Sequence, residues 1–196
     1  MAFVGVFLDR DGTLNEDPGY LGDPEKVTLF PETGKALYKL KTKLNAKLIV
    51  ISNQSGLARG LLKTADVEAV NIRINELLRD DRVTIDAFYY CPYHPDYNTP
   101  EECECRKPSP KLVYEAANKF KIDLNCSFFI GDSVADIHCG MNAGLKTILV
   151  KTGYGLESIS LLKKENNFPT FVANNLMDAC NFILNDFNGD KKFVAS

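Results

Sequence analysis

Hydrophobic and polar positions alternate along the chain in two kinds of segment. Short, continuously apolar runs rich in β-branched and aromatic residues predict strands that are buried on both faces. Between them, longer stretches carry apolar residues at helical spacing and predict amphipathic helices. The predicted strands span 3–8, 46–52, 85–91, 126–131 and 146–151, with a weaker strand at 170–174. The predicted helices span 32–44, 64–80, 109–121, 134–143 and 175–186.

This regular alternation of strand and helix predicts an α/β fold. Such βαβ units build a mainly parallel sheet with helices on both faces, a Rossmann-like three-layer α/β/α sandwich. The 196 residues, 45% of them hydrophobic, are enough to bury one core. We therefore expect a single domain over residues 1–188 and a frayed tail at 189–196.

Composition and charge narrow the functional classes. A formal net charge of -3 and a pI near 5.5 leave no overall basic surface, which disfavours a nucleic-acid binder and favours a small partner. No apolar run reaches the ~20 residues that cross a bilayer, and the first residues lack the features of a secretion signal. We expect a cytoplasmic monomer that binds neither membrane nor nucleic acid.

Polar residues gather where the predicted strands end. Asp9 and Asp11 follow the first strand, "SNQSG" (52–56) follows the second, and Asp132 follows the fourth. Because the carboxyl ends of parallel strands meet at one edge of a sheet, where ligands bind, we expect these side chains to lie together. Asp9 and Asp11 are two positions apart and can act on one ligand, one as nucleophile and the other in proton transfer.

A phosphoryl-transfer site fits these residue types. Two carboxylates repel a phosphate dianion unless cations intervene. Asp9 and Asp132 can hold a hard divalent ion such as Mg²⁺, and Lys107 can supply a positive point charge. Residues 52–53 offer uncharged donors for the remaining phosphate oxygens. Asp136 is either a partner behind the metal ligands or a charge at the start of a helix.

The motifs resemble those of the haloacid dehalogenase (HAD) superfamily. "FLDRDGTLN" (7–15) is similar to its nucleophile motif, and Ser52, Lys107 and "GDSVAD" (131–136) lie at the places of the other three motifs. The order and spacing agree over roughly residues 3–151. The resemblance implies a HAD-like fold with Asp9 as nucleophile and Asp11 as general acid and base. It also implies Mg²⁺ held by Asp9, the Asp11 carbonyl oxygen and Asp132.

Further segments resemble one branch of that superfamily. "DRDGTLNEDPGYLGDPEKVTLFP", "SNQSGLARG", "YYCPYHP" and "CECRKPSP" are similar to the D-glycero-D-manno-heptose 1,7-bisphosphate 7-phosphatases, with histidinol-phosphate phosphatase domains as near relatives. Members lack a cap domain, and the short connections of this chain agree. The resemblance implies a Mg²⁺-dependent phosphomonoester hydrolase that removes the 7-phosphate of a sugar bisphosphate through an aspartyl-phosphate intermediate. It implies ligand contacts from Asp17, Gly19, Tyr20, Ser52, Asn53, Gln54, Ser55, Arg59 and Arg106.

The segment 91–108 carries a possible zinc site. Four side chains in it can bind Zn²⁺: Cys91, His94, Cys103 and Cys105. A Cys-x-x-His paired with a Cys-x-Cys can close a tetrahedron, so we expect a structural zinc ion that holds this loop beside Lys107. The relatives typically carry Cys-x-His, whereas Tyr93 takes that histidine position here. The alternatives are free thiols or a disulfide.

Two other functions remain open from the sequence. The same chemistry can act on another small phosphate ester, such as histidinol phosphate. A zinc-containing binding module without catalysis is an alternative of a different class, which the acidic pI disfavours.

Overall fold

The computed structural model describes residues 2–194, and the side chains of residues 2–187. Its sheet has six strands in the order β3-β2-β1-β4-β5-β6, and every neighbouring pair is parallel. The strands are β1 (Phe3–Leu8), β2 (Lys47–Asn53), β3 (Ala87–Cys91), β4 (Ile122–Gly131), β5 (Lys146–Val150) and β6 (Phe171–Ala173). The helices are α1 (Thr33–Leu44), α2 (Thr64–Leu78), α3 (Lys111–Phe120), α4 (Val134–Asn142), α5 (Gly155–Lys164) and α6 (Leu176–Val194).

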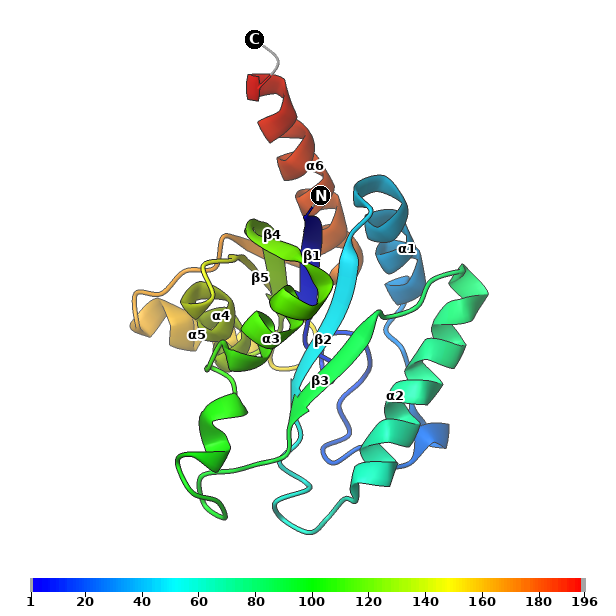
Figure 1. Cartoon of the computed structure of the whole chain (residues 1–196), viewed down its shortest axis with the longest axis vertical. Coiled ribbons are helices and arrows are strands. Elements are labelled where there is room, and N and C mark those ends of the chain that lie inside the picture. The colour runs from blue at the N-terminus through cyan, green and yellow to red at the C-terminus, as the bar shows by residue number, and fades with distance from the viewer. Residues whose placement is uncertain (1, 195–196) are drawn as a thin grey trace.

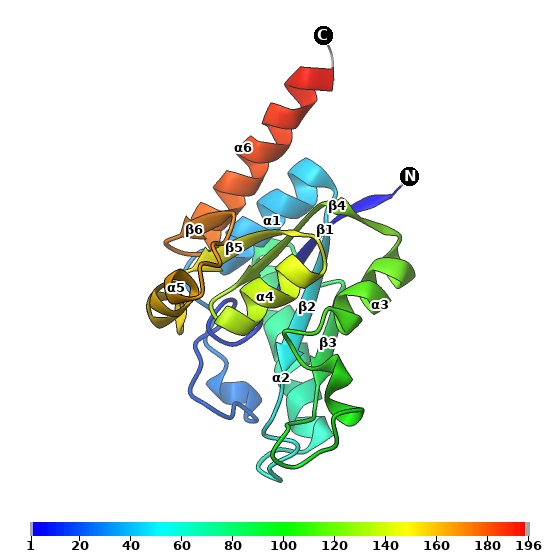
Figure 2. The ribbon, with the colours of Figure 1, turned by 90° about the vertical axis from the view of Figure 1, so that its left-hand side faces the viewer.

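Helices cover both faces of this sheet (Figures 1 and 2). One buried cluster packs β1, β2, β4 and β5 against α1, α2 and α6. A second cluster packs the opposite face against α3, and a third joins α4, β5 and α5. The predicted Rossmann-like three-layer sandwich is therefore confirmed.

The central strand β1 shows why its sequence is continuously apolar. Val6 and Leu8 belong to the cluster beneath α1, α2 and α6, whereas Phe7 between them belongs to the cluster beneath α3. Successive side chains of a strand point to opposite faces, so a strand covered on both sides needs no polar positions. Phe7 also stacks on Phe129 of β4, with the ring centroids 6.4 Å apart.

The carboxyl ends of the strands point to one edge of the sheet. The strand order reverses direction between β1 and β4, which is the switch point where open α/β sheets bind ligands. The connection from β1 to α1 contains only a short 3-10 helix, Pro24–Lys26, and the connection from β3 to α3 contains another, Glu102–Cys105. Loops therefore surround this edge of the sheet, and the described residues include no cap domain.

The structure differs from the predicted elements in three places. Helix α5 was not predicted, because it buries Leu162 but leaves Leu156 and Leu161 exposed and so shows no single apolar stripe. Strand β4 begins four residues earlier than predicted, at Ile122. Helix α6 continues to Val194, so the predicted frayed tail falls partly on this helix and partly outside the described residues.

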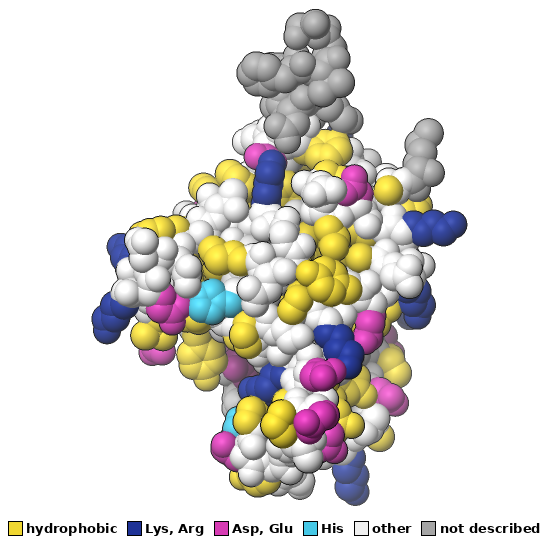
Figure 3. All heavy atoms as spheres, turned by 60° about the vertical axis from the view of Figure 1, so that its left-hand side comes forward, with side chains coloured by type: hydrophobic (Ala, Val, Ile, Leu, Met, Phe, Trp, Pro, Cys, Tyr) yellow, Lys and Arg dark blue, Asp and Glu magenta, His cyan; other side chains and the backbone are white. Residues whose placement is uncertain are grey.

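The surface agrees with the slightly negative net charge. On the face that α3, α4 and α5 cover, acidic and basic side chains are interspersed, with hydrophobic side chains between them (Figure 3). Within residues 2–194, no helix combines the length and the apolar character that a membrane span requires.

Candidate active site

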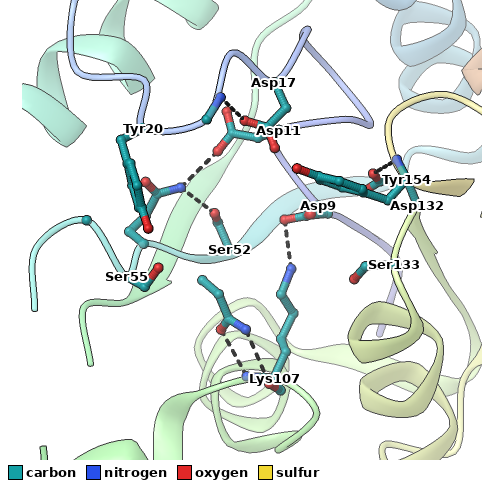
Figure 4. Close-up of a pocket in the computed structure, with 14 residues that line it drawn as sticks. Asp9, Asp11, Asp17, Tyr20, Ser52, Ser55, Lys107, Asp132, Ser133 and Tyr154 are labelled. Atoms are coloured by element: carbon teal, nitrogen blue, oxygen red, sulfur yellow. Dashed lines mark hydrogen bonds and ion pairs between the residues drawn. The ribbon is translucent and has the colours of Figure 1, made fainter. Parts of the chain in front are cut away.

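A pocket of about 400 Å³ opens at the carboxyl ends of β1, β2 and β4 (Figure 4). It brings together the predicted catalytic side chains and most of the predicted ligand contacts. From the predicted set it is lined by Asp9, Asp11, Asp17, Gly19, Tyr20, Ser52, Asn53, Gln54, Ser55, Lys107 and Asp132. In this view Tyr20 lies on the side of Ser55, and Tyr154 lies beside Asp132.

The end of β1 places Asp9 beside Asp132. The Asp9 amide still donates to the Ile130 carbonyl at 2.9 Å, so the hydrogen bonds between β1 and β4 continue to Asp9. The chain then turns at Gly12, whose φ is 83° and whose amide donates to the Asn15 carbonyl at 2.8 Å. A Cβ at position 12 would collide with the Asp132 carboxylate. Glycine therefore provides both the left-handed backbone and the close approach to Asp132.

Lys107 is buried and its ammonium group is fully paired. Its Nζ lies 2.7 Å from Asp9 Oδ1 and 2.6 Å from Asp136 Oδ1, and it donates to the Ile51 carbonyl at 2.8 Å. Its backbone is held by Asn53, which accepts from the Lys107 amide at 3.0 Å and donates to the Lys107 carbonyl at 3.2 Å. Asn53, predicted as a ligand contact, thus also positions the lysine.

Burial and mutual repulsion shift the titration of these groups. Burial raises the pKa of Asp9, and the Asp136 charge raises it further, while Lys107 opposes both effects in part. The same two causes raise the pKa of Asp132 to about 7. Burial alone lowers the pKa of Lys107, but the Asp136 and Asp9 carboxylates outweigh it and the net direction is upward. Lys107 therefore stays positively charged. Its single charge does not balance the negative charges of Asp9, Asp132 and Asp136.

These carboxylates fit a divalent cation. Among the described residues, Asp9, Asp132 and Asp136 form the group of side chains that can share a metal, with ligand atoms within 4.8 Å of one another. The Asp132 oxygens accept from the Tyr154 amide at 2.8 Å and from the Thr13 hydroxyl at 3.3 Å. Oxygen ligands, partial burial and excess negative charge are what a Mg²⁺ site requires.

Asp136 fills both of the roles left open by the sequence. Its Oδ2 accepts from the amide and the hydroxyl of Ser133, at 2.9 Å and 2.6 Å, and so caps the start of α4. Its Oδ1 pairs with Lys107, which also pairs with Asp9. One carboxylate thereby connects the start of α4 to Lys107.

Asp11 is held by a set of donors from three segments. Arg10 Nη2 lies 2.8 Å from Asp11 Oδ2, and Arg10 Nε lies 3.1 Å from each carboxylate oxygen. Asn15 Nδ2 donates to Oδ1 at 2.9 Å, and Gln54 Nε2 donates to Oδ2 at 3.0 Å. Gln54 Nε2 also donates to the Ser52 hydroxyl at 2.7 Å. The contacts of Arg10 could not be predicted from the sequence pattern.

The two predicted arginine contacts lie outside the pocket lining. Arg59 stacks over the Tyr97 ring at 5.2 Å and lies 3.9 Å from Asp96 Oδ2. Arg106 donates to the Tyr93 carbonyl at 3.1 Å. Burial lowers the pKa of Arg106; Cys103 opposes that effect, and the charge of Arg59 adds to it.

The structure does not support the predicted zinc site. Cys91 and Cys105 form a disulfide, and Cys103 is free. The physical reason is that the ligand atoms have other partners: the sulfurs of Cys91 and Cys105 are bonded to each other, His94 Nε2 lies 3.3 Å from Arg59 Nη2, and His94 Nδ1 accepts from the Asp96 amide at 3.2 Å. Tyr93, at the histidine position of the relatives, packs in the same cluster as Cys91. Of the predicted alternatives, the disulfide is the one present.

Besides the role of Arg10, which lies outside the pocket lining, sequence reasoning missed three residues that line the pocket. Gly56, Ser133 and Tyr154 also line the pocket. Tyr154 belongs to "TGYG", which follows β5 at the same edge of the sheet as the other polar segments. Its position after a predicted strand was the signal that could have identified it.

A parallel sheet with paired aspartates, a buried lysine and a further aspartate at its switch point has the architecture of a HAD-like hydrolase. Residues 104–179 match the HAD-hydrolase-like family model. The chain is 42% identical over 183 residues to the D-glycero-D-manno-heptose-1,7-bisphosphate 7-phosphatase of Chlorobaculum tepidum, covering 89% of this chain and 90% of that protein. It is 34% identical over 177 residues to the D-glycero-beta-D-manno-heptose-1,7-bisphosphate 7-phosphatase of Escherichia coli K12, covering 88% and 90%.

A solved structure agrees with these relatives. The crystal structure of D,D-heptose 1,7-bisphosphate phosphatase from B. bronchiseptica, complexed with magnesium and phosphate, superposes with a TM-score of 0.83 at 30% identity. The match covers 94% of this chain and 99% of that one. The chain therefore belongs to the haloacid dehalogenase-like hydrolases, in the same branch as these phosphatases, and it is a phosphomonoester hydrolase.

Proposed function

We propose that this protein removes the 7-phosphate of D-glycero-D-manno-heptose 1,7-bisphosphate through an aspartyl-phosphate intermediate, in a reaction that depends on Mg²⁺. The observation that carries this is the position of Lys107 Nζ, 2.7 Å from Asp9 Oδ1, in a pocket that also gathers Asp132. A carboxylate paired with a buried ammonium is an oriented nucleophile, and the ammonium is a permanent positive charge for the incoming phosphate.

The reaction takes two steps. In the first, an Asp9 carboxylate oxygen bonds to phosphorus, the bond from phosphorus to the sugar oxygen breaks, and Asp11, which enters this step protonated, gives its proton to that oxygen. In the second, Asp11 takes a proton from a water molecule whose oxygen attacks phosphorus, and the bond to Asp9 breaks to release phosphate. Asp9 and Asp11 both line the pocket, as this division of roles requires.

Mg²⁺ would be held by Asp9, Asp132 and the Asp11 carbonyl oxygen, and when bound it offsets the negative charge of the carboxylates and the phosphate. The protein supplies the remaining contacts. Gln54 donates to the Ser52 oxygen, which leaves the hydroxyl hydrogen of Ser52 for a phosphate oxygen. Lys107 brings positive charge to the same group.

The second phosphate of the substrate has a candidate partner in Arg59 and Arg106. The charge of Arg59 acts on Arg106, and a phosphate dianion near both guanidinium groups would be attracted by each of them. Both belong to loops at the active-site edge, next to pocket residues of the segment 52–56 and to Lys107. The bisphosphate branch to which the named relatives belong supports the same substrate.

Phosphate release from a panel of sugar mono- and bisphosphates, with histidinol phosphate included, tests this proposal. We expect Mg²⁺-dependent release and a kcat/KM for the heptose 1,7-bisphosphate at least about tenfold above every other compound, because a second phosphate adds charged contacts. A higher kcat/KM for histidinol phosphate would show that the protein is a histidinol-phosphate phosphatase instead. Absence of Mg²⁺-dependent release from any compound would reject the catalytic proposal.

A further inference from the structure

The guanidinium group of Arg10 is fully buried, although it lies between two catalytic carboxylates in the sequence. Arg10 is 0% exposed and is the largest of the fully buried side chains among the described residues. It does not line the pocket. Burying a charged group costs free energy unless the charge is paired and hydrogen-bonded, so its partners indicate what it does.

The guanidinium group of Arg10 binds Asp11 through two of its nitrogens and a residue of α2 through the third. Arg10 Nε and Nη2 both reach the Asp11 carboxylate, at 3.1 Å and 2.8 Å. Arg10 Nη1 donates to Asn71 Oδ1 at 3.1 Å, and Asn71 is a buried residue of α2. The planar group therefore connects the catalytic loop to a helix that is 61 residues distant in the sequence.

The donors around Asp11 differ in how freely they can move. A carboxylate has about four acceptor positions, and Arg10, Asn15 and Gln54 together occupy both of its oxygens. A leaving-group oxygen can meet Asp11 only where one donor gives way. Gln54 lines the pocket and can do so, whereas Arg10 is fixed by Asn71 and full burial. The face that Asp11 presents to the pocket is therefore set by Arg10.

We propose that Arg10, anchored by Asn71, is a positioning residue that orients Asp11 for proton transfer to the leaving group. It acts through Asp11 and touches no substrate atom. This inference rests on the proposed role of Asp11 as general acid and base. General acid–base catalysis contributes about 10² to 10⁴ in rate, and it depends on hydrogen-bond geometry, so a loosened Asp11 should lose part of that factor.

Leaving-group dependence separates positioning from a general structural role. A sugar phosphate needs a proton on its leaving oxygen, whereas p-nitrophenyl phosphate releases a stable phenolate without one. In Asn71→Leu, we expect first-turnover cleavage of the sugar phosphate to slow about tenfold or more. The p-nitrophenolate burst should keep its rate, and KM should change less than kcat. Arg10→Lys keeps a positive charge but lacks the planar guanidinium group that binds the Asp11 carboxylate through two nitrogens. It should therefore give the same pattern.

Asn75→Leu is the matched control. Asn75 lies one turn further along α2 and bonds to the Ile85 backbone at 2.7 Å and 3.4 Å, without contact to Arg10. It should destabilise the protein to a similar extent. The ratio of the first-turnover rates on the sugar phosphate and on p-nitrophenyl phosphate should stay unchanged.

Two results would overturn the inference: equal slowing of both substrates by Asn71→Leu and Arg10→Lys, or the same change of ratio in Asn75→Leu. Should Asn71→Leu not fold, Arg10→Lys decides by the same ratio. A wild-type protein that forms no phosphorylated Asp9 would instead reject the proposed function, and this inference with it. A normal wild-type burst with an unchanged ratio in both variants rejects the positioning role alone.

Discussion

Lys107 and Asp136 form an ion pair of 2.6 Å in which the lysine side chain is 3% exposed and the aspartate side chain 0%. The other oxygen of Asp136 caps α4 through Ser133. One carboxylate thus contacts both the start of α4 and the Lys107 ammonium group. Because Asp136 also repels Asp9 and Asp132, the same group that fixes the lysine raises the need for a cation in the pocket.

Replacing Asp136 by asparagine tests this ion pair. Breaking a buried pair costs roughly 3–5 kcal/mol when the remaining charge is left alone, but Lys107 retains Asp9 and the Ile51 carbonyl. We therefore expect Asp136→Asn to lower the free energy of unfolding by about 2–3 kcal/mol in urea titrations. Ser133→Ala is the control, because it removes a cap contact alone and should cost only about 1 kcal/mol. Equal losses in the two variants would show that the pair with Lys107 contributes little.

Asp9→Asn tests the nucleophile. The amide keeps the shape of the side chain but cannot form an acyl phosphate, so we expect kcat to fall at least about a thousandfold. The substitution also removes a carboxylate that Asp136 and Asp132 repel, which offsets part of the lost pairing with Lys107. Rapid acid quench with ³²P-labelled substrate measures the covalent intermediate, which should be absent in this variant.

Asp11→Asn is the companion variant for the same measurement. It cannot activate water, so a labelled intermediate should form slowly and persist. Label on the protein in Asp9→Asn, or no label in either wild type or Asp11→Asn, would contradict the assignment of Asp9.

The parts of this fold that could be predicted from the sequence are those set by local pattern. Strands buried on both faces have no polar positions, and polar residues directly after them must lie at the carboxyl edge of a parallel sheet. Asp9 and Asp132 could therefore be placed together, although they are far apart in the chain, and the pocket contains both.

The parts that could not be predicted depend on distant partners. Arg10 lies in a charged segment, where an arginine is usually solvated, and only its tertiary contact with Asn71 explains its burial. His94 has a zinc-binding side chain at a plausible spacing, but its ring nitrogens have Arg59 and the Asp96 amide as partners. Spacing alone does not determine which partner a loop residue finds.

Gly12→Ala tests the close approach of the catalytic loop to Asp132. A left-handed backbone costs a residue with a Cβ about 1–2 kcal/mol, and here the Cβ would also displace the Asp132 carboxylate. We expect a loss of stability of about 2 kcal/mol or more, about tenfold weaker Mg²⁺ binding and a matching loss of activity at limiting Mg²⁺. Urea titrations and Mg²⁺-dependence of phosphate release measure these effects.

Gly144→Ala is the matched control for that variant. Gly144 has a similar φ of 74° after α4, and no atom lies within 4 Å of a Cβ there. It should lose about 1 kcal/mol in stability and bind Mg²⁺ as the wild type does. If Gly12→Ala behaves like Gly144→Ala in both measurements, the approach to Asp132 does not matter for the metal.

The free energy of unfolding should depend on pH, because Asp9 and Asp132 are buried close to the charge of Asp136. Burial and the Asp136 charge raise the pKa of Asp132 from 3.8 to about 7, and they raise the pKa of Asp9 as well. Between these two values the folded protein binds more protons than the unfolded chain. The free energy of unfolding therefore falls as pH rises from about 4 to about 7. We expect the Tm measured in EDTA to decrease over this interval.

Magnesium should reverse that trend, because metal ligation needs ionised carboxylates and releases protons. With Mg²⁺ present, the stabilisation relative to EDTA should increase with pH and be largest above about 7. Asp132→Asn isolates the effect, since it removes the titrating group and should flatten the decline seen in EDTA. A Tm in EDTA that falls equally in wild type and Asp132→Asn would assign the decline to other groups. Mg²⁺ stabilisation that is independent of pH would place the metal away from these carboxylates.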